Sequence, residues 1–541
     1  MKQFNYKPFF PHPEIRDQQA QAIEFALDAF INKNKKFVVI QAGTGVGKSA
    51  VGIAVARYIS AHCSDEPDYA EGACYVTTQK ILQDQYMRDF SPPSGRMCSI
   101  KSSSNYSCHF MKGKTCKDAQ QMLRTVEKES PFFKACSFKC GYKERKREFL
   151  ESPESVTNFP YLMTEAAYSG KIVPRQVLVV DEAHNVESEL SKFVEVIVSE
   201  RFATQNLKLK WPRKTTQYQV YRWIKDVYYP KAKSQLKHFE DMLKQVGIKD
   251  RLGDFTTIAK QHDLLSSHVE KMQMFLAVYN SDNWVMENVK AFGRAKRKFS
   301  FRAIDIAPFA RKYLFRLGNR TLLMSATILD ITTFSRSLGI TDADVGYLSI
   351  PSPFPVENRP IHVFPIGRMS AKEIDVTLPK MVKAVREILN QHKGEKGIIH
   401  CHTYKVANFI KSRIKSNRLL IHKSDNRDEI LQKHINAKTP TVLISPSMAE
   451  GVDLKDDLSR FQIILKIPYP YLGDPLVRKR MNRWSDWYSL QTAKSILQSI
   501  GRSVRSQSDE AVTYILDADW SRFYSKNSNM FPRDFKKALR R

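Results

Sequence analysis

The sequence lacks the segments that an exported or membrane-spanning protein needs. No run approaches the roughly 20 apolar residues of a membrane helix, and the first residues, MKQFNYKPFFPHPEIRDQQ, hold no apolar core of signal-peptide length. Eight cysteines in 541 residues make no disulfide framework, and in a reducing compartment a cysteine cluster is more typical of metal binding. We therefore expect an intracellular protein of the cytoplasm or nucleoid that does not contact the membrane.

Acidic residues are few relative to basic ones. Lys and Arg number 86 against 56 Asp and Glu, and the formal net charge is +30. Such a surface attracts polyanions and gains affinity by releasing counterions from phosphates. A basic surface that only improves solubility would have the same composition, and composition alone does not separate DNA, RNA and anionic membranes.

The apolar pattern predicts two α/β domains. The chain is too long for one core and should divide into several folded units. Short apolar strands alternate with helices, which is typical of a parallel sheet that binds ligands at the carboxyl ends of its strands. The strands of the first domain are expected in FVVI, ACYVTT, QVLVVD and RTLLMS, and those of the second in KGIIHCHT, PTVLISPS, RFQIILKIP and AVTYILD.

Two insertions interrupt the first domain. Residues 91–150 are polar, rich in cysteine and strongly basic, whereas residues 190–304 have helical periodicity, many aromatics and little strand character. The expected parts of the first domain are therefore 1–90, 151–189 and 305–345, and the second domain is expected at 346–541.

A phosphate-binding loop, AGTGVGKS, follows the first apolar strand and precedes a helix. Its glycines allow backbone amides to surround phosphates, Lys48 places a charge on the β and γ phosphates, and Ser49 can ligate Mg²⁺. The predicted nucleotide ligands are Ala42, Gly43, Thr44, Gly45, Val46, Gly47, Lys48 and Ser49.

The tetrapeptide DEAH at 181–184 follows the strand VLVV. Asp181 would hold Mg²⁺, directly or through water, and Glu182 would orient or deprotonate the attacking water. A general base beside the metal suits hydrolysis better than transfer to a bound alcohol.

These two elements and three later ones resemble the motifs of superfamily 2 helicases. MSAT (324–327), EGVD (450–453) and QSIGRSVR (498–505) look like motifs III, V and VI, and all five occur in the expected order. GIIHCHTY (397–404) is a weaker match to motif IV. RDQQ (16–19) resembles the adenine-side Arg-x-x-Gln element, which implicates Arg16 and Gln19. The resemblance also adds Gly451, Asp453 and Gln498 to the nucleotide site.

Arg502 and Arg505 are the expected link between hydrolysis and motion. They stand three residues apart on an expected helix of the second domain, from which they would reach across a cleft. There they would stabilise the charge of the transition state, as arginine fingers do. Gln498 and His184 are expected to couple the two domains.

Five of the eight cysteines fall in one short window: Cys98, Cys108, Cys116, Cys136 and Cys140. The last four are separated by seven, nineteen and three residues, which matches neither common ferredoxin spacing. Zinc accepts the same four thiolates, so spacing alone leaves the metal open.

The position of these cysteines resembles that in XPD/DinG-type helicases. They lie between the first and second motifs, a basic run and VTNFPYL follow, and IPYPYLGDPLV occurs later. The resemblance implies a 4Fe–4S cluster on Cys108, Cys116, Cys136 and Cys140, with Cys98 outside it and His109 a neighbour. Bound zinc, or loss of the cluster, remains an alternative.

The resemblance also identifies residues 190–304 as an arch-like insertion. Its aromatics interleave with Lys and Arg and either stack on bases or form packing core; they include Trp211, Tyr218, Tyr221, Trp223, Tyr228 and Tyr229.

Taken together, the motifs predict an ATP- and Mg²⁺-dependent DNA helicase of the DEAH-box type, acting as a monomer on single-stranded and forked DNA in repair or replication. A 5′ to 3′ direction is implied by the resemblance alone. A translocase that does not unwind DNA, an ATPase switch on a nucleic-acid scaffold, and an RNA-directed helicase are the alternatives.

Overall fold

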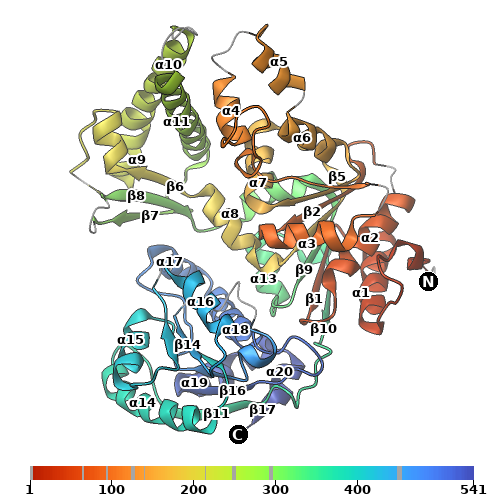
Figure 1. Ribbon diagram of the computed structural model, residues 1–541, viewed down its shortest axis with the longest axis vertical. Helices are drawn as coiled ribbons and strands as arrows, with labels where there is room; N and C mark the ends of the chain where they lie inside the picture. The colour runs from red at the N-terminus through yellow and green to blue at the C-terminus, as the bar shows by residue number, and fades with distance from the viewer. Residues whose placement is uncertain are drawn as a thin grey trace.

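Figure 1 shows a computed structural model in which two sheet-containing domains lie one above the other and two further lobes extend from the upper domain. The structure describes residues 4–63, 66–92, 95–123, 128–138, 140–213, 215–245, 252–291, 296–423, 425–446 and 454–540. Among these residues, no helix is long and apolar enough to cross a bilayer.

The first domain is built on a seven-stranded sheet in which every strand pair is parallel. Its strands, in spatial order, are β10 (Val345–Ile350), β1 (Phe37–Ala42), β9 (Gly318–Ser325), β5 (Arg175–Asp181), β2 (Ala70–Thr77), β4 (Glu154–Asn158) and β3 (Met97–Ser99). The expected parallel α/β fold is confirmed, with β3, β4 and β10 as additional strands.

Both faces of this sheet are covered, so its strands are apolar on both sides. Val38 and Ile40 of β1 pack with α1 (Asp17–Leu27), α2 (Lys48–His62) and α3 (Lys80–Phe90), whereas Phe37 and Val39 point into the opposite core. The opposite face packs against α7 (Phe159–Thr164), α8 (Val186–Val194), α12 (Ala307–Phe309) and α13 (Ile331–Leu338). Because alternate residues of β1 are buried in two different cores, the sequence of β1 is a continuous apolar run.

The second domain holds another seven-stranded parallel sheet. Its spatial order is β13 (Leu419–Ile421), β14 (Val442–Ser445), β12 (Gly397–His400), β15 (Phe461–Ile464), β16 (Val512–Asp517), β11 (Ile361–Gly367) and β17 (Leu539–Arg540). Its helices are α14 (Ile374–Gln391), α15 (Tyr404–Arg413), α16 (Arg427–Asn436), α17 (Pro475–Arg483), α18 (Ser485–Ile500), α19 (Asp519–Asn527) and α20 (Arg533–Ala538).

The expected boundary at residue 346 falls inside β10, which pairs with β1 of the first sheet. The chain therefore leaves the first domain only after Ile350. Because β10 is a partly exposed edge strand with a weak apolar pattern, its sequence does not predict that it belongs to this sheet.

The arch insertion contains more strand than its sequence indicates. Its helices α9 (Gln217–Trp223), α10 (Tyr229–Gln245) and α11 (Leu252–Val278) stand on an antiparallel sheet of β6 (Val196–Ser199), β8 (Lys298–Ala303) and β7 (Trp284–Val289). These strands are short, and β6 lies about 100 residues from β8 in sequence, so local periodicity did not reveal them.

The cysteine-bearing segment forms the second lobe in Figure 1. It comprises α4 (Cys116–Met122), α5 (Pro131–Phe138) and α6 (Gly141–Glu151), which follow β3 and return to the sheet through β4. Helix α4 contacts α11, so the two insertions meet above the first sheet.

Candidate functional site: the nucleotide cleft and the cysteine cavity

The phosphate-binding loop connects β1 to α2, and its glycines are required by geometry. Gly45 and Gly47 have φ of 92° and 84°, in the left-handed region where a Cβ is strained. A side chain on Gly43 would come within 2.6 Å of the backbone of Ser352. The loop therefore packs closely against its neighbours at the start of α2, where amides and the helix N-terminus favour an anion.

Two oxygen groups suited to Mg²⁺ lie side by side below the loop. Ser49 Oγ donates to Asp181 Oδ2 at 2.9 Å, and Tyr86 OH donates to the same oxygen at 3.0 Å. Hydroxyl and carboxylate oxygens are the ligands that Mg²⁺ takes beside phosphates, so this pair fits the ion. Lys48 starts α2, with Nζ 3.4 Å from the carbonyl of Ala42.

The two carboxyls of the DEAH motif are shifted in opposite directions. Burial and the neighbouring Glu182 carboxylate raise the pKa of Asp181. Burial also acts to raise the pKa of Glu182, but its hydrogen bond with His184 and the charges of Lys48 and Arg502 outweigh this and lower that pKa to about 2. Glu182 is thus an anion at neutral pH. Its backbone φ of 53° lies in the left-handed region.

His184 connects two motifs within the first domain. Its Nδ1 lies 2.7 Å from Ser325 Oγ, at the end of β9, and 3.2 Å from Glu182 Oε2. Contact with the second domain comes from its backbone, because Lys494 Nζ donates to its carbonyl oxygen at 3.3 Å. Gln498, the other expected coupling residue, is buried on α18.

Arg16 and Gln19 lie against the phosphate-binding loop. Arg16 Nη1 donates to the carbonyl of Gly45 at 2.7 Å, and the Arg16 backbone N–H donates to Gln19 Oε1 at 3.0 Å. A side chain on Gly47 would meet Gln19 Nε2 at 2.5 Å. The start of α1 is therefore tied to the phosphate-binding loop.

Arg502 approaches the nucleotide site from the second domain, since its charge acts on Glu182. The expectation of a helix at Arg502 and Arg505 is wrong: α18 ends at Ile500, Arg502 follows in a turn, and Arg505 lies in irregular backbone. The Arg505 backbone N–H donates to Asp509 Oδ2 at 3.0 Å. Gly501 ends the helix here and lines the cleft between the domains. Gly451 and Asp453 lie outside the described residues.

The segment between the domains covers the phosphate-binding loop, which the sequence did not indicate. Ser352 Oγ donates to the carbonyl of Thr44 at 3.1 Å, and the ring of Phe354 fills the space beside Gly45. Phe354 also packs against Val504, two residues after Arg502. These contacts line a cleft of about 540 Å³ between the two sheets.

A second unforeseen contact joins the domains behind the DEAH motif. Glu187, in the first turn of α8, accepts hydrogen bonds from Arg480 Nη1 at 2.6 Å and from Trp487 Nε1 at 2.8 Å. No local signal could have found this pair, because Glu187 and Arg480 are 293 residues apart.

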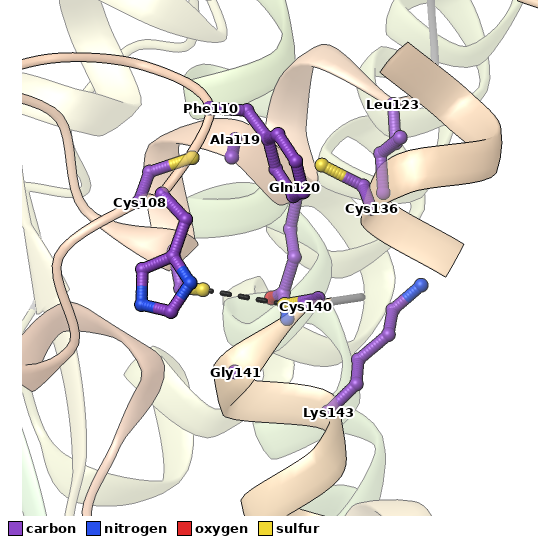
Figure 2. Close-up of a pocket in the computed structure, with 11 residues that line it drawn as sticks. Cys108, Phe110, Ala119, Gln120, Leu123, Cys136, Cys140, Gly141 and Lys143 are labelled. Carbon is purple, nitrogen blue, oxygen red and sulfur yellow. Dashed lines mark hydrogen bonds between the residues drawn. The ribbon is translucent and has the colours of Figure 1, made fainter. Parts of the chain in front are cut away.

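The four cysteines expected to bind a cluster line one small cavity (Figure 2). Cys108 lies in the loop after β3, Cys116 begins α4, Cys136 is in α5, and Cys140 precedes α6. All four are buried and unoxidised, and Cys116 Sγ lies 3.4 Å from Cys140 Sγ. Cys98 is elsewhere, with its sulfur 3.8 Å from the carbonyl of Arg145.

Four buried thiols around one cavity are a donor set that either a 4Fe–4S cluster or a zinc ion accepts. Cys116 Sγ and Cys140 Sγ, 3.4 Å apart, lie closer together than two thiolates bound to different irons of a cluster, so the sulfurs would have to move apart to hold one. Burial raises the pKa of Cys116 to about 11 and also raises the pKa of Cys136.

Comparisons with known proteins agree with this geometry. A family model described as "Helicase C-terminal domain" matches residues 385–538, and one described as "Type III restriction enzyme, res subunit" matches residues 12–210. A solved XPD helicase structure superposes with a TM-score of 0.65 at 17% identity, covering 96% of this chain and 98% of that one. The chain is therefore similar to XPD/DinG-type superfamily 2 helicases in its fold and in parts of its sequence.

Two curated relatives illustrate the range of similarity to this chain. The ATP-dependent DNA helicase DinG of Photobacterium profundum is 27% identical over 36% of this chain and 31% of its own length. A probable ATP-dependent helicase of Methanocaldococcus jannaschii is 20% identical over 95% of this chain and 93% of its own. Apart from the latter, the matches span about a third or less of the first relatives' length.

The aromatic residues of the arch insertion are mainly packing residues. Trp211 stacks on Phe299 with ring centroids 4.4 Å apart, and Tyr221 stacks on Tyr279 at 3.8 Å. Tyr228 is fully buried, whereas Tyr218 is 62% exposed. Trp223 lies 5.4 Å from Tyr228, and Tyr229 packs partly buried against the same core.

Proposed function

We propose that the chain is an ATP-dependent DNA helicase that moves along single-stranded DNA and couples ATP hydrolysis to unwinding. The observation that carries the proposal is that the DEAH motif of one parallel-sheet domain faces the other domain: Lys494 Nζ donates to the carbonyl of His184 at 3.3 Å, and the charge of Arg502 helps to lower the pKa of Glu182. A site divided in this way can change shape when the γ phosphate is cleaved, because each domain contacts one side of it. The 5′ to 3′ direction rests on the family resemblance.

Each residue of the cleft has a chemical task in this proposal. Loop amides and Lys48 bind the phosphates, and Glu182, ionised at neutral pH, orients and deprotonates the attacking water. Arg502 stabilises the negative charge that develops on the γ phosphate. Ser49 and Asp181 would hold Mg²⁺, which neutralises charge on the β and γ oxygens when bound.

The cysteine cavity is proposed as the 4Fe–4S site, on Cys108, Cys116, Cys136 and Cys140. When bound, the cluster would cross-link three short helices of this segment. These cysteines lie away from the phosphate-binding loop on the far edge of the first sheet, where β3 and β4 end the strand order. A segment at that position supports a role in separating strands and not in hydrolysis.

The test is ATPase activity titrated with single-stranded DNA and with RNA of equal length, followed by displacement of a strand from a forked duplex. We expect DNA to stimulate hydrolysis and the fork to be opened. Lys48→Ala should lose both activities, and Glu182→Gln should lose hydrolysis while still binding ATP.

Other outcomes identify the other functions. Stimulation without strand displacement would indicate a translocase that does not unwind DNA. Preference for RNA would reassign the substrate, and hydrolysis that neither strand stimulates would refute a motor on nucleic acid. Binding that falls log-linearly with salt, at roughly −0.7 per phosphate neutralised, is expected for a single strand.

A further inference from the structure

The arch insertion contains a cavity of about 570 Å³ between β6 and the helices α10 and α11. Its walls include Phe202, Phe239 and Leu265, and Ile197 and Leu264 at its edge are 41% and 64% exposed. Large apolar side chains left in solvent beside a hollow of this size are typical of a binding site and not of a packing defect.

The polar groups of this cavity are four amides, the hydroxyls of Ser199 and Tyr228, and one histidine. Gln205, Asn206, Gln235 and Gln261 line it, and no Asp, Glu, Lys or Arg does so among the described residues. Within the same described part of the chain, the amides of Gln235 and Gln261 have no protein partner. Each therefore offers a donor and an acceptor to a ligand.

His268 keeps the cavity free of charge. Its Nε2 lies 2.9 Å from Tyr228 OH, and burial together with the charge of Lys271 lowers the pKa of His268 to about 4. At neutral pH the imidazole is uncharged, so nothing in the lining favours a phosphate or a carboxylate.

Positive charge lies outside the cavity. Residues 190–304 contain 22 Lys and Arg against 11 Asp and Glu. Lys231 is exposed one turn before Gln235 on α10, and these two residues and Phe239 share one face of that helix. A ligand with a neutral planar part and an external anionic part is complementary to this arrangement.

The cavity lies close to the junction of the two insertions. Figure 1 shows α11 as the arch helix nearer to α4. Hydrogen bonds from Thr115 lower the pKa of Asp118 on α4, and the charge of Lys260 on α11 adds to that effect. Lys260 immediately precedes Gln261, so the cavity begins one residue from the contact between the lobes.

We propose that this cavity receives one unpaired nucleobase of the single strand on which the chain acts. The proposal rests on the proposed function. The base stacks against Phe239 while Gln235 and Gln261 hydrogen-bond to its edge, and Lys231 contacts the backbone outside. Because the amides can turn to present either donor or acceptor, the site accepts different bases.

The test compares two ligands of equal length and charge at one salt concentration: oligothymidylate and a strand of abasic sites. Removing one stacked or hydrogen-bonded base contact weakens binding at least about fivefold. We therefore expect Gln261→Ala and Phe239→Leu each to weaken binding of oligothymidylate by that factor and to leave the abasic strand unaffected.

Two further variants distinguish contacts with the base from contacts with the phosphate. Lys231→Ala should weaken both strands to the same extent and lower the salt dependence, because it contacts phosphate alone. The matched control is Gln273→Ala, an equally exposed amide on α11 that does not line the cavity. It should change neither affinity. As a measurement without variants, 4-thiothymidine should photo-crosslink to peptides of α10 or α11.

The proposal would be overturned if Gln261→Ala and Phe239→Leu bound oligothymidylate as tightly as the parent chain does. Equal losses of affinity for both strands, or crosslinks confined to other elements, would also overturn it. The proposed function fails differently. In that case the parent chain itself would neither bind oligothymidylate nor be stimulated by it.

Discussion

Arg480 Nη1 lies 2.6 Å from Glu187 Oε1, and this ion pair joins α17 of the second domain to α8 of the first. The guanidinium is almost fully buried and makes three further hydrogen bonds, to the carbonyls of Ala303 and Ile304 and to Ser191 Oγ. Burial lowers the pKa of Arg480, and the Glu187 carboxylate acts against that shift by favouring the charged guanidinium.

The pair matters because α8 begins directly after the DEAH motif. Glu187 is five residues beyond Glu182, so we expect a displacement of Glu182 to reach Arg480 through the short segment between them. The second domain is therefore attached to the first next to the DEAH motif.

Glu187→Ala should uncouple the domains. Leaving the buried Arg480 charge unpaired costs about 3–5 kcal/mol in the arrangement described here, so the domains should separate more readily. We expect a larger radius of gyration by small-angle scattering and a lower DNA-stimulated kcat, with ATP affinity unchanged. Glu189→Gln on the same helix, whose partner Lys192 is exposed, is the control. A kcat equal to that of the control would show that the pair does not couple the domains.

Substitution of two buried cysteines tests which metal group the cavity binds. Cys136→Ser removes a sulfur that lines the cavity, whereas Cys98→Ser removes one outside it. Purified without oxygen, the parent chain and Cys98→Ser should be yellow-brown with about four irons per chain, and Cys136→Ser should lose most of its iron. One zinc and no iron in the parent would show that the four thiols hold zinc.

Much of the first domain could be predicted from sequence because its signals are local. A strand of six buried residues, a glycine loop and a helix follow one another in residues 37–62, and their order alone predicts a phosphate site. The parallel fold follows in the same way from buried strands that end in polar residues. Gly45 and Gly47 indeed need the backbone freedom that only glycine provides.

What the sequence did not indicate depends on distant partners. Glu187 meets Arg480 and Phe354 meets Gly45 only because two domains fold against each other, and no periodicity within one segment encodes that. Strands β6 and β8 pair across the whole arch. The sequence predicts a helix at Arg502 because the helical pattern of α18 continues up to Ile500. Gly501 ends that helix, and Arg502 lies in the turn that follows.

Acid should destabilise the second domain through His434 on α16. Its Nε2 donates to the carbonyl of Leu458 and its Nδ1 accepts from the Thr441 hydroxyl, both at 2.9 Å, which requires the neutral ring. Burial, offset in part by the bond to Leu458 and aided by the charge of Lys396, lowers the pKa of His434 to about 4. The unfolded chain, with a pKa near 6.5, therefore binds this proton first.

The sign follows from that order. The stabilisation is complete above pH ~6.5 and is lost as pH falls toward 4, by about 1.4 kcal/mol per pH unit for one such group. Urea midpoints at pH 7.5 and 5.5 should differ by less in His434→Gln than in the parent. An unchanged difference would show that His434 does not contribute to the acid sensitivity.

Phe354 should influence turnover more than nucleotide binding. Its ring is 7% exposed and touches Gly45 of the first domain and Val504 of the second. Val504 is two residues from Arg502, so the ring helps to fix the arginine relative to Glu182. Phe354→Leu keeps an apolar side chain but loses the planar contact, and we expect a tenfold or greater loss of kcat, of the order that misplaced transition-state groups cause.

Separate measurements of kcat and of the KM for ATP show whether the Phe354 ring acts through Arg502 or through the phosphate-binding loop. Loop amides and Lys48 remain in Phe354→Leu, so the KM for ATP should change by no more than about twofold if Phe354 acts through Arg502. Phe364→Leu, an exposed phenylalanine on β11, is the control for a general effect on the second domain. A raised KM with normal kcat would instead mean that Phe354 shapes the phosphate-binding loop itself. An Arg502→Ala background separates the two roles further, because adding Phe354→Leu there should lower kcat little more if both residues act in one step.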